Sequence, residues 1–325
     1  MYIKAATLDD LLRGVFDKLL RSKNRISPRR GKATESIAVL LQITNPRARL
    51  SLTETKARFS SCLGELLWYL AKSKDLQFIT YYLSRYQKES EDGRTVYGGY
   101  GPRLFHMRGT DQIKNVLDLL KHKRDSRRAV IQLFDAADIA TEHNDVPCTC
   151  TMQFMIRRHR LHMLTHMRSN DAFIGLPHDV FAFTMLQEIM ARTLGVELGI
   201  YNHAVGSLHL YERDRPGARK YLNEGWQSTK PMPPMPAMNP WSSIGRVVKA
   251  ERAIRRGRNI EIGDLRLPPY WADLVRLLRI FAHFKKKESP AITQLKSKMS
   301  IRLYDSYIED LVKRLQSKSV NTHAQ

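Results

Sequence analysis

The chain has 325 residues, of which 42% are hydrophobic and 26% charged, and its formal net charge at pH 7 is +22. This composition is ordinary for a soluble globular protein, and the length suits one large domain with an appendage or two modest domains. No apolar run approaches the roughly 20 residues that a membrane-spanning helix needs, and the N-terminus lacks the apolar core of a signal peptide. The sequence therefore predicts a soluble cytoplasmic protein with no membrane partner.

The excess of positive charge predicts attraction to anionic ligands or polyanions. Much of it lies in residues 249–259, in the run from Lys285 to Lys287 and in a Lys/Arg-rich tail. Because a run of charge is more often a solvated surface than a binding surface, nucleic-acid or acidic-partner binding is a secondary alternative to recognition of a small anion.

The chain contains three cysteines, Cys62, Cys148 and Cys150. They are too few for a disulfide framework, and a Cys-Thr-Cys string without further Cys/His clusters makes a poor zinc site. We therefore expect reduced thiols and no metal site, with Cys62 as a buried, unreactive thiol inside a helix.

The first elements alternate between helix and strand. Leucine, valine and phenylalanine recur at helical spacing over residues 8–22, which predicts an amphipathic helix. The basic stretch 24–36 contains prolines and a glycine, which favour a loop that presents arginines and backbone donors to an anion. Residues 36–43 are expected to form a strand and residues 54–73 a helix.

The middle of the chain predicts a sheet followed by a buried helix. Three segments are rich in apolar and alternating positions, as sheet strands are: 128–134, 151–157 and 161–167. Arg160 falls in a short polar turn between the last two, which indicates a hairpin. Residues 179–194 predict a helix that is buried on much of its circumference and ends at Gly195.

The proline-rich run at 231–240 breaks regular structure and indicates a linker or a surface crossing. Beyond it, residues 270–284 and 301–316 predict amphipathic helices. The elements together predict an α+β fold, with helices packed on a mixed sheet over residues 1–230, followed by a linker and a basic helical C-terminal extension over 231–325.

The residues with the clearest chemistry lie between positions 145 and 211, in DVPCTCTMQF, MRSNDAFIGLPHDV and GSLHLY. Cys148 follows a proline that restrains the chain, and a thiol beside a phosphate-binding arginine is easier to ionise. Arg168 and Ser169 supply charged and neutral donors for phosphate oxygens. These residues predict covalent chemistry on a phosphorylated small molecule.

Other motifs occur in a fixed order before this stretch: PRRGKAT with Arg29 and Gly31, GELLWYL with Glu65, VYGGYG with Tyr97, and DSRR with Arg127 and Arg128. In this order and spacing, over roughly residues 28–230, the chain resembles the thymidylate synthases and the related pyrimidine nucleotide hydroxymethylases. The resemblance implies a thymidylate synthase-like fold. It also implies that a cysteine adds to C6 of a pyrimidine so that C5 can attack a one-carbon carrier.

The resemblance implies a role for each matching residue. By this resemblance the nucleophile is Cys148, Glu65 is the proton-relay carboxylate, and Tyr97 is the phenol near the C5 proton. The phosphate is held by Arg29, Arg168 and Ser169 of one subunit and by Arg127 and Arg128 of the other. The sugar hydroxyl is held by His209 and Tyr211, and the folate side is formed by Asp171 and Gly175. These roles imply a homodimer and 5,10-methylenetetrahydrofolate as co-substrate. Taken alone, the adjacent arginines could form structural ion pairs, Glu65 could be a surface or helix-start residue, and Tyr97 could simply pack.

Asp179 decides the predicted substrate. The uracil enzymes of this family have asparagine here, whose amide donates to O4 and accepts from N3–H, and cytosine reverses both requirements. A protonated aspartate can accept from the cytosine amine and donate to N3, whereas an ionised one can pair with a ring protonated there, so the resemblance favours cytidylate. The alternative is that Asp179 is the N-cap of the helix that follows.

Several departures from the synthase pattern indicate a different end of the reaction. Thr149 replaces the usual histidine beside the nucleophile, Ser207 replaces an aspartate, and the region Thr80 to Tyr82 stands where synthases carry tryptophans that exclude water. The closing C-terminal tail of the synthases has no counterpart. We therefore expect water to attack the C5 methylene, which gives a dCMP or CMP hydroxymethylase. The alternatives are a thymidylate synthase acting on dUMP and a nucleic-acid-binding protein with a degenerate synthase fold.

Overall fold

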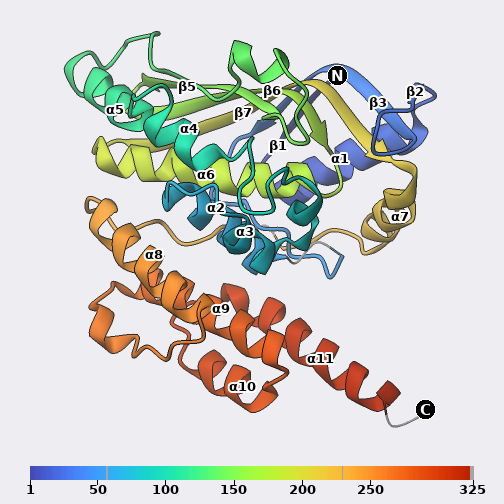
Figure 1. Cartoon of the computed structure of the whole chain (residues 1–325), viewed down its shortest axis with the longest axis vertical. Coiled ribbons are helices and arrows are strands. Elements are labelled where there is room, and N and C mark those ends of the chain that lie inside the picture. Colours follow the sequence, from blue (N-terminus) through green and yellow to red (C-terminus); the bar gives the residue numbers. More distant parts are fainter. Residues whose placement is uncertain (56–57, 229, 323–325) are drawn as a thin grey trace.

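The structure is a computed structural model that describes residues 1–55, 58–228 and 230–322 (Figure 1). In these residues seven strands form one sheet in the order β1-β3-β7-β6-β5-β4, with β2 beside β3. Their bounds are β1 Tyr2–Ala5, β2 Arg25–Ile26, β3 Ala33–Ile43, β4 Val130–Gln132, β5 Thr149–Arg157, β6 Arg160–Asp171 and β7 Glu197–Tyr211. Strands β6 and β7 are parallel whereas β5 and β6 are antiparallel. The predicted α+β fold with a mixed sheet is confirmed.

The hairpin between β5 and β6 follows from its turn residues. Arg158 and His159 both have positive φ, 49° and 60°, which is the backbone of a two-residue turn that matches the twist of the flanking strands. Arg157 and Arg160 are opposite each other across the turn. The predicted hairpin is confirmed. Its turn is formed by Arg158 and His159, whereas Arg160, which was expected in the turn, is the first residue of β6.

Helices α1 (Leu8–Arg21) and α6 (Gly175–Thr193) run along one face of the sheet in Figure 1. Most of the α6 side chains are buried, because this helix lies between the sheet and helix α2 (Phe59–Leu70) and contacts both. Gly195, with a φ of 64°, follows its end as predicted. However, α6 begins four residues earlier than the sequence indicated.

The remaining helices complete the two sides of the molecule. Around the sheet are α3 Leu76–Tyr82, α4 Tyr100–His106, α5 Gln112–His122 and α7 Arg215–Asn223, with the 3₁₀ turns η1 Ser84–Lys88, η2 Ala136–Ile139 and η3 Glu212–Asp214. The C-terminal extension contains α8 Trp241–Arg255, α9 Pro269–Lys286, α10 Ser289–Ser297 and α11 Asp305–Thr322, with η4 Gly263–Leu265 and η5 Arg302–Tyr304. No helix among the described residues is both long and apolar enough to cross a bilayer.

The proline-rich crossing before the extension is packed rather than free. Met232 and Met235 are each 1% exposed. The backbone N–H of Met232 donates to the carbonyl of Arg47 at 2.8 Å, and that of Met235 donates to Oε1 of Glu188 at 2.9 Å. These contacts anchor the crossing to α6, and of the two predicted interpretations the surface crossing describes it better than the linker.

The extension packs directly on helices that surround the site. The hydroxyl of Tyr307 in α11 lies 2.6 Å from Oγ of Ser60 in α2. Tyr82 at the end of α3 donates to Glu251 of α8 at 3.0 Å, and its ring stacks on Phe281 of α9 with centroids 5.4 Å apart. The C-terminal helices therefore support both α2 and α3 from below in Figure 1.

Candidate active site

Cys148 lies immediately before β5, and Arg168 of the neighbouring strand β6 holds the chain around it. The backbone N–H of Arg168 donates to the carbonyl of Cys148 at 2.8 Å. Its guanidinium donates to the carbonyls of Pro147 at 3.0 Å and Val146 at 2.8 Å. Arg168 therefore fixes the backbone that carries the thiol.

The ionisation of Cys148 reflects two opposing effects. Burial raises the pKa of the thiol to about 11, and the charge of Arg168 acts to lower it. The sequence indicated that the arginine would ease ionisation. The structure shows this influence, but burial outweighs it, so the group is a neutral thiol at pH 7.

Tyr100, rather than Tyr97, has its hydroxyl beside the nucleophile segment. It donates to Oγ1 of Thr149 at 3.0 Å and accepts from the Thr149 backbone N–H at 3.1 Å. The ring of Tyr97 instead stacks on His143, with centroids 3.5 Å apart, and its hydroxyl bonds to Asp138. No hydrogen bond joins Tyr97 to Cys148 among the described residues, and the expected place of the Tyr97 phenol near C5 of a bound pyrimidine stays a prediction.

Glu65 lies inside α2 and is 3% exposed. Its Oε1 accepts a hydrogen bond from the hydroxyl of Tyr86 at 2.7 Å, and the Tyr86 ring packs on Trp68 with centroids 5.6 Å apart. A buried carboxylate needs such a donor. The interpretation of Glu65 as a surface or helix-start residue is therefore wrong.

Asp179 lies inside α6, four residues after the first helical residue, Gly175. An N-cap precedes the helix, and that position belongs to Ile174, so the N-cap interpretation of Asp179 is wrong. Its Oδ2 accepts a hydrogen bond from Nδ2 of Asn170 at 2.7 Å. The carboxyl group is thus oriented by a neutral amide.

A chain of hydrogen bonds fixes that amide. The Tyr201 hydroxyl lies 2.7 Å from Nδ1 of His203, and Nε2 of His203 lies 2.9 Å from Oδ1 of Asn170. Burial lowers the pKa of His203 to about 3, so its ring is neutral. Because an amide oxygen only accepts, Nε2 carries the proton and Nδ1 accepts from Tyr201. The donor end of Asn170 therefore faces Asp179.

The protonation of Asp179 follows from its surroundings. Burial raises the pKa of this carboxyl to about 8, the charge of Glu65 acts in the same direction, and the hydrogen bond from Asn170 opposes both. At pH 7 the group is mainly protonated, and it offers one O–H donor together with acceptor oxygens.

Gly175 permits the close packing behind this group. A Cβ atom at Gly175 would lie 2.9 Å from Nδ2 of Asn170 and 3.6 Å from Oδ2 of Asp179. Any larger residue would displace the amide that orients the carboxyl. Asp171, the other residue predicted for the folate side, accepts a hydrogen bond from the backbone N–H of Phe173 at 2.8 Å. Burial raises the pKa of the nearby Tyr211, and the charge of Asp171 acts in the same direction.

Several predicted phosphate and sugar residues lie around Cys148. Arg29 donates to the carbonyl of Asn144, in the segment that leads to the nucleophile, at 3.0 Å. Ser169 follows Arg168 on β6. His209 and Tyr211, each 7% exposed, have ring centroids 4.9 Å apart on β7. The structure therefore brings these predicted residues together.

Arg127 and Arg128 lie apart from that cluster. Both precede β4 and are exposed, and Gln153 donates to the carbonyl of Arg127 at 2.9 Å. Neither guanidinium forms an ion pair with a carboxylate of the described residues, so the interpretation as structural ion pairs is not supported within this chain. Their predicted action on a partner subunit stays a prediction.

Four residues near the site were missed from the sequence: Arg30, Arg85, Tyr86 and Asn170. Arg30 pairs with Glu89 at 2.6 Å, and its charge acts to lower the pKa of Cys148. Conversely, Tyr81 and Tyr82, expected where synthases carry tryptophans, pack on α9 and α8 of the extension. Arg85 and Tyr86 are coupled to Glu65 instead. The polar motif SRYQK was the available signal for this turn.

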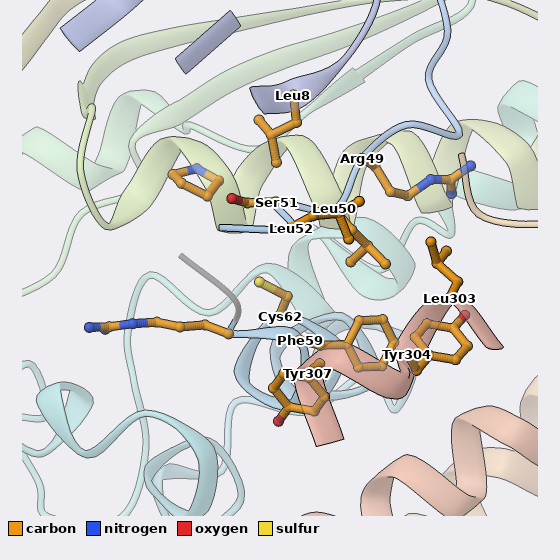
Figure 2. A pocket seen from close by; sticks show the side chains of 12 residues that line it. Leu8, Arg49, Leu50, Ser51, Leu52, Phe59, Cys62, Leu303, Tyr304 and Tyr307 are labelled. Atoms are coloured by element: carbon orange, nitrogen blue, oxygen red, sulfur yellow. The ribbon is translucent and has the colours of Figure 1, made fainter. Parts of the chain in front are cut away.

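A cavity of about 30 Å³ lies beside α2, between residues 49–52 and the extension (Figure 2). Tyr304 and Tyr307 line it from the extension, and Cys62 and Phe59 from α2. This volume suits one or two water molecules rather than a nucleotide. Burial raises the pKa of Cys62 well above its usual range, in agreement with the expected unreactive thiol. No cluster of potential metal ligands occurs among residues 1–55, 58–228 and 230–322.

The fold is a mixed sheet covered by helices, and Cys148 stands immediately before its strand β5. A family model described as thymidylate synthase matches residues 8–243, and the chain therefore belongs to the thymidylate synthase family.

Two curated relatives carry the same printed name, deoxyuridylate hydroxymethyltransferase. The protein of Pseudomonas phage M6 is 36% identical over 153 residues, which cover 46% of this chain and 44% of the relative. The protein of Delftia phage PhiW-14 is 30% identical over 198 residues, which cover 57% of this chain and 55% of the relative. The chain thus spans about half the length of the curated relatives it matches.

Proposed function

We propose that this protein is a pyrimidine nucleotide hydroxymethyltransferase that acts on dCMP or CMP, with 5,10-methylenetetrahydrofolate as the carbon donor. Membership of the thymidylate synthase family supports one-carbon transfer to C5 of a pyrimidine nucleoside monophosphate. The names of both relatives support hydroxymethylation as its end. The choice of cytosine rests on Asp179.

The reaction begins at Cys148. Its proton leaves and the thiolate adds to C6, which makes C5 nucleophilic towards the folate methylene. Loss of the C5 proton and departure of tetrahydrofolate leave an exocyclic methylene at C5. Water adds to this methylene, its proton leaves, and the thiolate departs from C6 as the ring double bond re-forms. Glu65 is the carboxylate that moves protons in these steps.

The protonation of Asp179 is the observation that carries the cytidylate assignment. A carboxyl group that stays protonated near pH 7, with Oδ2 oriented by Asn170, offers the donor and the acceptor that N3 and the exocyclic amine of cytosine require. Uracil offers N3–H and O4, which demand the reverse set. Mispairing of such buried groups costs about 1–3 kcal/mol for each group left unsatisfied.

The second candidate is hydroxymethylation of dUMP, and the names of the two relatives favour it. In that reaction a protonated Asp179 would donate to O4 and accept from N3–H. The two candidates differ only in which base edge meets the carboxyl group, so a direct competition of substrates separates them.

We further propose that the protein acts as a homodimer. Tyr2 and Leu40 are register partners on β1 and β3 and are exposed, as is Ile37. Apolar residues exposed together on a sheet are typical of an interaction surface. The exposed guanidinium groups of Arg127 and Arg128 could then reach the phosphate of the partner subunit.

The test compares 5-tritiated dCMP, CMP and dUMP with methylenetetrahydrofolate. Wild-type protein should release tritium fastest from a cytidylate and give a product 30 Da heavier, the mass of the added CH₂O. Asp179→Asn should change the ratio of kcat/KM for dCMP over dUMP at least about 100-fold towards dUMP. Cys148→Ser should give no product, and the exposed-site control Asp264→Asn should keep the wild-type ratio. Faster turnover of dUMP by wild-type protein would overturn the cytidylate assignment.

A further inference from the structure

Arg85 is a cation next to the catalytic carboxylate with no ion-pair partner of its own. It belongs to η1, the turn that also supplies Tyr86; the residue is exposed overall, but other side chains crowd its guanidinium group. Its guanidinium carbon lies 5.6 Å from the centroid of the Tyr86 ring, and the Tyr86 hydroxyl donates to Glu65 at 2.7 Å. No carboxylate among the described residues forms an ion pair with Arg85. The cation is therefore available to the site.

The charges around Arg85 converge from three elements. Burial acts to lower its pKa, but Tyr86, Glu65, Asp171 and Asp179 together raise it above its usual range. These carboxyl groups come from α2, β6 and α6, so the guanidinium faces the same space as the side chains assigned to the base and the folate. A surface arginine that served only solubility would have no such convergence.

We propose that Arg85 is a positioning residue for the water step, which binds the water that attacks the C5 methylene and holds it beside Glu65. The inference rests on the proposed hydroxymethyltransferase function. The water oxygen forms a bond to the exocyclic methylene carbon, and the π electrons of the methylene move into the ring. The water proton passes to Glu65, and the C6–S bond then breaks to release the thiolate of Cys148. No electron donor or acceptor is needed beyond these groups.

The position of Arg85 explains why this site favours water. An aromatic side chain beside the methylene would exclude water, whereas a guanidinium carries several N–H donors that hold it. Tyr86 donates to one oxygen of Glu65, which leaves the other oxygen able to accept the water proton. Arg85 and Tyr86 come from the same turn, so a water held by the guanidinium group lies on the side of Glu65 from which Tyr86 approaches.

The test uses Arg85→Met, Arg85→Lys and the matched control Arg94→Met, an exposed arginine in the next loop. Under single-turnover conditions with the best nucleotide, tritium release from C5 reports the steps before water attack, and mass analysis reports the hydroxymethyl product. Arg85→Met should slow product formation at least about tenfold more than tritium release. Arg85→Lys should restore much of the product rate, and Arg94→Met should match wild type.

Three outcomes would overturn the inference. One is an unchanged product rate in Arg85→Met. Another is a raised KM for nucleotide or folate at unchanged kcat, which would make Arg85 a ligand-binding residue. The third is equal slowing of tritium release and of product formation, which a structural role would give. Wild-type protein that forms no product 30 Da heavier would instead contradict the proposed function itself, and the two failures are therefore distinct.

Discussion

Helix α6 carries two inward-facing carboxyl groups, Asp179 near its start and Glu188 near its end, in contrasting surroundings. Glu188 pairs with Arg49, and both side chains are at most 2% exposed. It also accepts from the backbone N–H of Met235. Among the described residues, the hydrogen-bond partner of Asp179 is the neutral amide of Asn170. One carboxyl group is paired with a cation, whereas burial raises the pKa of the other to about 8, so that it keeps its proton at pH 7 and remains available to a ligand.

The carboxyl groups of Glu188 and Asp179 differ in role: the first stabilises the fold, and the second is left free for chemistry. A buried ion pair whose partners satisfy each other holds two segments together, and here it joins α6 to residue 49 and the proline-rich crossing. A buried carboxyl without a cation stays sensitive to what enters the site. The pair at Glu188 is itself imperfect, since Nε and Nη1 of Arg49 are buried without partners. Removing either residue therefore tests the contrast directly.

The largest expected effect is a loss of stability on substitution of Glu188. Glu188→Ala leaves the Arg49 cation buried and unpaired, and should lower the free energy of unfolding by about 3–5 kcal/mol. Chemical denaturation measures this loss, with Glu197→Ala, an exposed position on β7, as control. A loss below about 1 kcal/mol would show that the pair does not hold the crossing in place.

The next effect is expected on substitution of Asp179 and should appear in activity rather than in stability. Asp179→Ala removes the carboxyl that is proposed to contact the base, and should lower kcat/KM at least about 100-fold, or about 2.7 kcal/mol. The melting temperature should stay the same or rise, because a carboxyl that is costly to ionise has been removed. A large drop in melting temperature would place Asp179 in the same class as Glu188.

A smaller effect is expected where the chain of hydrogen bonds behind Asp179 is broken. His203→Phe removes the donor that orients Asn170, and should lower kcat/KM for the preferred nucleotide by about tenfold, equivalent to about 1.4 kcal/mol. Steady-state kinetics measure it, and His166→Phe, on the exposed face of β6, is the control. If both variants behave alike, the amide is oriented by other contacts.

The last effect is a graded dependence on pH. The pKa of Asp179 in the folded protein is about 8, raised above its ordinary value of 3.8. The folded state thus holds this proton where the unfolded state has lost it, and the group makes stability fall as pH rises between these values. Asp179→Asn should therefore gain stability relative to wild type when pH is raised from 5 to 9. Base recognition by the protonated form should weaken above about pH 8.

Local patterns predicted the elements that depend on neighbouring residues. Helical spacing gave α1, and alternation with a polar turn gave the β5–β6 hairpin. The start of α6 was missed because Pro177 suggested a turn, although proline fits the first turn of a helix. Helix α8 was noted only as a run of charge. Strand β7 was not recognised, since glycines interrupt it; a Cβ at Gly199 would lie 2.8 Å from the carbonyl of Leu161.

The site residues that lie within single sequence motifs were predicted, whereas the contacts between distant residues were not. Cys148, Arg168 and Asp179 stand in recognisable strings, and the structure brings them into one region. Tyr86 and Glu65 are 21 positions apart, and His203 and Asn170 are 33 apart. Such contacts depend on how strands and helices pack, which no local pattern encodes. The hydrogen bond between Tyr97 and Asp138 was not predicted for the same reason, because Asp138 lies in a distant turn.

The bond between Ser60 and Tyr307 joins positions 247 residues apart in the chain. When helix α2, which carries Glu65, emerges from the ribosome, Tyr307, which supports this helix, has not yet been synthesised. Helix α2 therefore lacks this support until the chain has been synthesised as far as Tyr307. A message cut short before Tyr307 would yield a protein that contains every proposed catalytic residue and still lacks this support.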